Sequence, residues 1–139
     1  MLNYPHWLLL VWIFFSIFAK RKYILKPKNL KLIIMKAIDN LIGKKVIVRS
    51  YGAGVFFGTL NEVEKCEDKW TVELLNSRRI WYWEGACSIT QLAVDGTKNP
   101  SGCKFTVIEP SVIVSGVVEL HECSETAVKS IESVQEWKK

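Results

Sequence analysis

The chain has 139 residues, 49% of them apolar, and a formal net charge of +5 at pH 7, a length that suits one domain with an appendage. Residues 1–34 carry six Lys or Arg and no acid, whereas the remaining 13 Lys or Arg are set against all 14 Asp and Glu. Residues 35–139 therefore have a net charge of −1, which excludes a general electrostatic attraction to nucleic-acid backbones.

An apolar run at residues 7–19 opens the chain and is followed at once by the basic residues 20–22. The run is shorter than the roughly 20 residues that a membrane-spanning helix needs. A secretion signal would carry its basic residues before the apolar run. Two interpretations stay open: an over-extended gene start, with the protein beginning at Met35, or a membrane anchor. An anchor would place the following domain in the cytoplasm, because the basic cluster lies on that domain's side.

Residues 35–139 are predicted to form one small domain that begins with β-strands. Residues 44–50 are rich in β-branched side chains, which predicts a strand. The segment 51–54, Tyr-Gly-Ala-Gly, predicts a tight bend. Extended structure resumes over residues 55–63 and ends in a charged turn at 64–69.

Two further strands are predicted at residues 70–75 and 78–83, where apolar and aromatic side chains alternate with polar ones. The two residues between them, Asn76 and Ser77, predict a hairpin turn. Four strands in sequence order suggest a meander or a small barrel.

Helices and strands are mixed in the second half of the domain. The sequence Ser88-x-x-Gln91 is a capping box that predicts a short helix ending at Gly96. Strands are predicted at 104–109 and 112–122, with Pro110 between them. A final helix capped by Ser124 has apolar residues at helical spacing, namely Ala127, Val128, Ile131 and Val134. The expected fold class is α+β, a β-dominant small sheet or partly open barrel of about six strands with two short helices.

The segment 78–83, Arg-Arg-Ile-Trp-Tyr-Trp, carries the main candidate site. Alternation in a strand puts Arg79, Trp81 and Trp83 on one face and Arg78, Ile80 and Tyr82 on the other. Ile80 and Tyr82 suit a core, which leaves the first three as a cationic aromatic row that could stack a planar ring and hold an anion. Two indoles on one sheet face are also typical of a core or a subunit interface, so that interpretation stays open.

A second candidate is the end of the first strand, where Arg49 is followed by Tyr51 and Gly52. An arginine beside a glycine-rich bend can combine its guanidinium with free backbone N–H groups to bind an anion. The pattern is not a phosphate-binding P-loop. The alternative is a bulge that turns the strand.

The cysteines and histidines do not predict a metal site or a cofactor. Cys66, Cys87, Cys103 and Cys123 lack zinc-site spacing, and they are expected to be reduced. His121 and Cys123 would share one face of a strand, but alone they make half a site. No catalytic signature is present, and we do not expect an enzyme.

Four segments of the domain together resemble a family of short phage and prophage proteins without a secure function. They are Arg-x-Tyr-x-Ala-Gly-Val-x-x-Gly-x-Leu at 49–60, Arg-Arg-Ile-Trp-Tyr-Trp-x-Gly-Ala at 78–86, Gln-Leu-Ala-x-x-Gly at 91–96 and Cys-Lys-Phe at 103–105. This resemblance spans about residues 43–138. In outline the domain also resembles anti-defence sponge proteins of the Thoeris anti-defence type. That fold-level resemblance implies capture of a nucleotide-derived immune signal, without cleavage, between subunits.

We therefore expect a cytoplasmic, oligomeric, non-catalytic protein that sequesters a small anionic, nucleotide-like ligand. Arginines would hold phosphate, indoles would stack, and the glycine bend would close the site; the residues are Arg49, Tyr51, Gly52, Arg78, Arg79, Trp81 and Trp83. Two alternatives remain. One is a structural or protein-interaction module that uses the Trp row as an interface. The other is a membrane-anchored cytoplasmic domain, which requires residues 7–19 to be translated.

Overall fold

The structure of the chain, a computed structural model, describes residues 36–138. The predictions for the apolar run at 7–19 and for a start at Met35 lie outside the described residues. Residues 36–39 form a helical turn, and residues 40–138 lie in one compact unit. Within the described part of the chain, no helix has the length and apolar character needed to cross a membrane.

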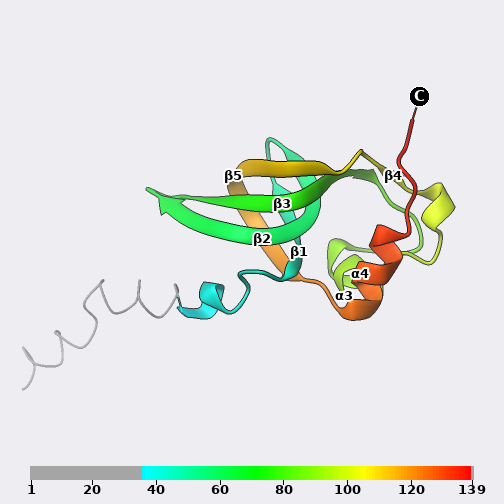
Figure 1. The fold of residues 1–139 in the computed structure, drawn as a ribbon, viewed down its shortest axis with the longest axis horizontal. Helices are drawn as coiled ribbons and strands as arrows, with labels where there is room; N and C mark the ends of the chain where they lie inside the picture. The colour runs from blue at the N-terminus through cyan, green and yellow to red at the C-terminus, as the bar shows by residue number, and fades with distance from the viewer. Residues whose placement is uncertain (1–35, 139) are drawn as a thin grey trace, which may run out of the picture. The chain divides into compact units, whose positions relative to one another are not determined.

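Five antiparallel strands make up one sheet, which confirms the β-dominant α+β class (Figure 1). They are β1 (Lys45–Ser50), β2 (Gly54–Cys66), β3 (Lys69–Tyr82), β4 (Lys104–Phe105) and β5 (Glu109–Glu122). The strand order is β2-β1-β5-β3-β4, and β2 also pairs with β3. The sheet is therefore partly ring-like, although it is not a barrel.

The hairpin predicted at Asn76 and Ser77 is wrong, because β3 runs through both residues as one strand. Phe57 pairs with Arg78 and Thr59 pairs with Leu75, so Gly58 alone faces the two residues between them. Asn76 takes up this extra residue in the left-handed conformation, at φ 46°, which asparagine tolerates better than most residues. Asn76 and Ser77, opposite Gly58, therefore form a β-bulge.

The true hairpin turn lies earlier, where the charged turn 64–69 was expected. Cys66 pairs with Lys69, so β2 and β3 form a long hairpin whose turn consists of Glu67 and Asp68. Glu67 has φ 54°, as a tight two-residue turn requires. The strands predicted at 70–75 and 78–83 are thus one strand, β3, and the strand predicted at 55–63 is shorter than the observed β2.

Pro110 also lies inside a strand rather than between two strands. It stands opposite Asn76, between the pairs Leu75–Ser111 and Ser77–Glu109. A proline has no N–H to donate to a neighbouring strand. Pro110 fits here because β3 and β5 form no residue pair at this position, opposite the bulge residue Asn76. The strand predicted at 104–109 is shorter in the structure, where β4 covers only Lys104–Phe105.

Both predicted helices are present and are capped as expected. In α3 (Ile89–Asp95) the Ser88 hydroxyl accepts from the N–H of Gln91 at 3.1 Å. Gln91 in turn accepts from the N–H of Cys87 at 2.8 Å, one residue earlier than a standard capping box. In α4 (Glu125–Glu132) the Ser124 hydroxyl accepts from the N–H of Ala127 at 3.0 Å. A short 3-10 turn, η1 (Pro100–Gly102), precedes β4.

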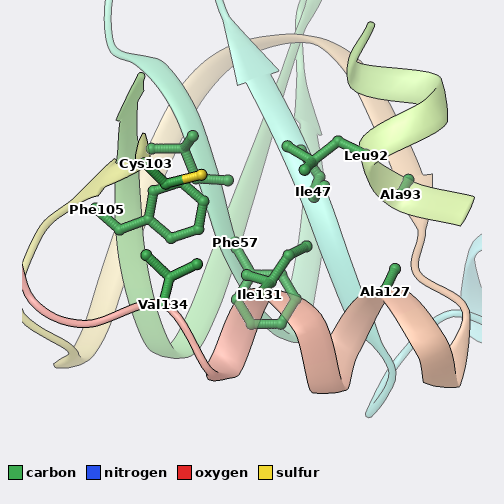
Figure 2. Close-up of a cluster of buried hydrophobic side chains, with 10 residues drawn as sticks. Ile47, Phe57, Leu92, Ala93, Cys103, Phe105, Ala127, Ile131 and Val134 are labelled. Carbon is green, nitrogen blue, oxygen red and sulfur yellow. The ribbon is translucent and has the colours of Figure 1, made fainter. Parts of the chain in front are cut away.

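The apolar side chains form two clusters, one on each face of the sheet. The helix-side core lies between the sheet and the two helices, as Figure 2 shows, and includes Ile47, Phe57, Phe105 and Ile131. The inner core lies on the other face; its buried members are Val46, Val48, Phe56, Leu60, Val72, Leu74 and Val114. The bulge at Asn76 switches β3 between them, since Leu74 belongs to the inner core and Ile80 to the helix-side core.

Candidate functional site

The second half of β3 carries an arginine held between two aromatic rings. Arg79 pairs with Phe56 across the β2–β3 ladder, and its guanidinium carbon lies 4.7 Å from the centroid of the Phe56 ring. The same carbon lies 5.3 Å from the Trp81 ring, two residues along the same strand face. Trp81 is 60% exposed. Phe56, Arg79 and Trp81 are called the Arg79 platform below.

The guanidinium of Arg79 differs from those of the other two arginines in the described part of the chain. Arg49 donates to Glu119 at 3.0 Å, and Arg78 donates to two carbonyl groups. Among residues 36–138 the guanidinium of Arg79 has no hydrogen-bond acceptor within bonding distance and no ion pair; its backbone N–H alone is bonded, to the Thr106 hydroxyl at 2.9 Å. Arg79 therefore keeps its N–H donors available while its guanidinium lies against two rings.

Arg78 is a structural residue. It is 4% exposed, and its guanidinium packs over the Phe105 ring at 5.2 Å. Its Nε–H donates to the Thr106 carbonyl at 3.1 Å, and its Nη1 donates to the Val134 carbonyl at 2.9 Å. Burial lowers the pKa of this guanidinium from its ordinary value. Arg78 thus ties the segment after α4 to the end of β4, and the structure does not direct it toward the platform.

Trp83 and Tyr82 are placed differently from the sequence interpretation. Trp83 packs against the helix-side core instead of extending the row of Arg79 and Trp81. Tyr82, which was expected in the core, is 48% exposed. The β3–β4 register is irregular between Ile80 and Tyr82: Ile80 pairs with Phe105 and Tyr82 with its neighbour Lys104, so the two β3 residues lie on opposite faces. Ile80 is buried in the core as predicted.

Tyr82 belongs to a second polar and aromatic cluster that sequence reasoning missed. Its hydroxyl donates to Glu84 at 3.1 Å, and this hydrogen bond raises the pKa of Tyr82 above its ordinary value. The ammonium of Lys104 lies 5.9 Å from the Tyr82 ring and 5.4 Å from the ring of Trp137. Lys104 therefore already occupies the space beside the Tyr82 and Trp137 rings.

Arg49 lies on the sheet face opposite to Arg79. Arg49 pairs with Val55, and Val55 pairs with Ile80. Directly paired residues share a face, whereas Ile80 and its neighbour Arg79 point to opposite faces. The structure therefore does not bring the two arginines together, and Arg49 is instead paired with Glu119.

Tyr51 and Gly52 line a hollow of about 640 Å³ beside β5, near Val117, where the pairing of β5 passes from β3 to β1. The opposite wall is formed by β5 residues, among them Ile113, Ser115 and Val118, which sequence reasoning did not single out. Neither Arg79 nor Trp81 belongs to the hollow. Of the seven candidate residues, Arg79 and Trp81 belong to the platform, and Tyr51 and Gly52 line the hollow. Arg78 is buried, Trp83 packs on the helix-side core, and Arg49 is in an ion pair.

A comparison with protein families identifies the domain that contains these features. A family model described as a domain of unknown function, DUF6948, matches residues 43–131. The chain belongs to the DUF6948 family. The match covers all five strands, α3, all but the last residue of α4, and the Arg79 platform. No curated protein and no solved structure gives a significant match to the chain.

The DUF6948 domain has its histidine and one cysteine together near the end of β5. His121 Nε2 lies 3.6 Å from a Glu119 oxygen, and this nitrogen is buried without a hydrogen bond. Within the described range no three residues among His, Cys, Asp and Glu are grouped to hold a metal ion. All four cysteines are free. Burial and the nearby Glu122 raise the pKa of Cys123 to about 12, so its thiol stays protonated at neutral pH.

Proposed function

We propose that the DUF6948 domain of this chain is a non-catalytic binding module that holds an anionic, ring-containing ligand on the Arg79 platform. The guanidinium of Arg79 would bind the anionic group, and the exposed face of Trp81 would stack on the ring. A nucleotide has both parts. The observation that carries the proposal is an arginine fixed between two aromatic rings and given no acceptor within residues 36–138.

The orientation of Arg79 supports binding for an energetic reason. An arginine that is free in solution loses side-chain entropy when it grips an anion. The Phe56 and Trp81 rings already restrict this side chain, so less entropy remains to be lost on binding. A planar guanidinium also matches phosphate or carboxylate with two parallel hydrogen bonds. Stacking on an exposed indole contributes about 1–3 kcal/mol for a nucleic-acid base.

The non-catalytic part of the proposal is consistent with the chemistry of Cys123. A thiol with a pKa near 12 is a poor nucleophile at neutral pH. A module that binds without cleaving would suit the sequestration of a nucleotide-derived signal, and the resemblance to phage anti-defence proteins extends the proposal to that role.

A second candidate function is a structural or protein-interaction module in which Trp81 is buried by a partner. The 60% exposure of this large apolar side chain favours it. The two functions differ in what the loss of Trp81 removes. A ligand platform would lose its ligand, whereas an interface would lose its partner or its oligomeric state.

Native mass spectrometry of the full chain, with a panel of mono-, di- and cyclic nucleotides, tests the proposal. We expect a discrete nucleotide adduct whose affinity falls about tenfold or more in Trp81→Ala and in Arg79→Ala. Arg49→Ala is the matched control, because Arg49 lies on the other face and is paired with Glu119; it should bind as the wild type does. Binding unchanged in both platform variants, or no adduct with any nucleotide, would refute the ligand assignment.

A further inference from the structure

Residues 109–116 of β5 form a strand edge that pairs with no second strand in the described part of the chain, although the Ser50 side chain donates to its Ser115 carbonyl. On one side β5 pairs with β3 from Glu109 to Val117. On the other side β1 joins β5 only from Val117 onward. Figure 1 shows β5 along the border of the sheet beyond β3, before it bends and continues beside β1. The first half of β5 is thus an open edge.

Along this edge the backbone groups of every second residue point away from β3. The hydroxyl of Ser50, on β1, donates to the Ser115 carbonyl at 2.8 Å, so this carbonyl faces the open side. In an antiparallel strand the N–H and C=O of one residue point to the same side, and every second residue repeats that direction. Ser111 and Ile113 therefore present their backbone groups to the open edge as well.

The part of the edge at residues 111–115 lacks the features that usually prevent pairing with another strand, since Glu109 and Pro110 lie before it. Open edges are commonly protected by charged side chains or by proline, and residues 111–115, Ser-Val-Ile-Val-Ser, contain neither. Ile113 is 70% exposed. β-Branched residues predominate in the segment, and they favour strand pairing. Such an edge is a template for another strand.

The sequence of the edge is palindromic about Ile113. Residues 111–115 read Ser-Val-Ile-Val-Ser in both directions. If two copies paired antiparallel about a two-fold axis at Ile113, each Ser111 would face Ser115 of the other copy and Ile113 would face itself. The outward-pointing backbone groups of one copy would then meet the same groups of the other copy, and no charge would be opposed. The Ser115 carbonyl, which already accepts from Ser50, would accept a second hydrogen bond. A two-fold interface requires this kind of self-complementarity.

We propose that the chain forms a two-fold symmetric homodimer by antiparallel pairing of residues 111–115 of β5 with the same residues of a second copy. The pairing would bury both Ile113 side chains against each other on one face of the joined sheet. The hollow between the Tyr51–Gly52 bend and β5 would receive the start of the β5 strand of the second copy. This surface is separate from the Arg79 platform, since Ile113 pairs with Glu73 and Trp81 lies at the far end of β3.

Sedimentation velocity and light scattering on the full chain test the proposal. We expect a dimer for the wild type at micromolar concentration. Ile113→Lys would place two like charges opposite each other and raise the dimer dissociation constant about a hundredfold or more. Val107→Lys is the matched control, because Val107 is similarly exposed but lies outside the strands, and it should remain dimeric. Thermal unfolding of the two variants should give equal midpoints at a concentration low enough to dissociate the dimer. Equal midpoints would separate lost pairing from lost folding.

Cross-linking tests the register independently. In a background of Cys66→Ser and Cys87→Ser, which removes the two exposed thiols, Ile113→Cys should give a covalent dimer with a short bifunctional thiol reagent, and Val107→Cys should not. Two outcomes would overturn the proposal: a monomeric wild type, or a dimer that survives Ile113→Lys, whether or not Trp81→Ala abolishes it. Neither of these outcomes depends on whether a nucleotide binds, so the dimer and the ligand proposals fail separately.

Discussion

Gly58 of β2 and Ser77 of β3 approach so closely that a Cβ atom on Gly58 would lie 2.9 Å from the Cβ of Ser77. The same atom would lie 3.1 Å from the Cα of Ser77 and 3.2 Å from the Cβ of Leu74. These are strand atoms that cannot move away as the end of a flexible side chain could. The bulge of β3 is thus accommodated by the absence of a side chain on the facing strand.

Gly58→Ala should destabilise the domain by about 1–3 kcal/mol, because the added methyl group overlaps atoms of β3. Urea denaturation measures the change. Gly52→Ala is the control: no atom lies within 4 Å of its added Cβ, and the change should be within about 0.5 kcal/mol of neutral. Equal stability of the two variants would show that β2 and β3 do not approach at this point.

Asn76 should respond to substitution according to its left-handed backbone. At φ 46°, Asn76→Gly is expected to be neutral or slightly stabilising. Asn76→Val should cost about 1–2 kcal/mol, because a β-branched residue is strained in this region. The comparison uses thermal or urea unfolding of both variants. A Val variant as stable as the Gly variant would contradict a bulge at this position.

Arg78 and Arg79 are adjacent, but their removal should have different effects. Arg78→Ala leaves two carbonyls without their donor in a buried site, and we expect a loss of about 3 kcal/mol or more. Arg79→Ala removes ring contacts at a half-buried position and should cost about 1 kcal/mol or less. Denaturation midpoints of the two variants provide the measurement. The reverse order would indicate that Arg79 is the structural arginine.

The pKa of Cys123 predicts a loss of stability in alkali. Because the folded-state pKa of about 12 exceeds the ordinary value of 9.0, the native thiol keeps its proton between these values while the unfolded thiol loses it. The unfolded state then binds fewer protons, so the free energy of unfolding decreases as pH rises above about 9. Thermal unfolding at pH 8 and pH 10.5 should show a smaller decrease for Cys123→Ala than for the wild type. An identical decrease would contradict the raised pKa.

Local signals in the sequence predicted the helices well and the strand connections poorly. The caps of α3 and α4 depend on Ser88 and Ser124 and on residues three positions away, so the sequence contains the whole interaction. Asn76 and Ser77 resemble a turn by residue type. They form a bulge because Gly58, almost 20 residues earlier, leaves space for an extra residue.

The candidate site shows the same limit. Alternation put Arg79 and Trp81 on one face and Arg78 on the face of Ile80, but it could not show what the buried Arg78 guanidinium binds. The acceptors of Arg78 are the carbonyls of Thr106 and Val134, which are 28 and 56 residues away in the chain. No local pattern marks a carbonyl as an acceptor for a distant guanidinium. The free edge at Ile113 became visible only when the strand order was known.

The bend of β5 has a consequence for how the chain folds. Val117 is paired with Trp70 of β3 and also with Ser50 of β1, so one strand completes two ladders. The β2–β3 hairpin closes through a two-residue turn, whereas Arg49 and Glu119 meet across 70 residues of chain. Since long loops close more slowly than short ones, the hairpin should form early and the β1–β5 ladder late. During synthesis, β1 can pair with its second partner, β5, only after almost the whole domain has been made.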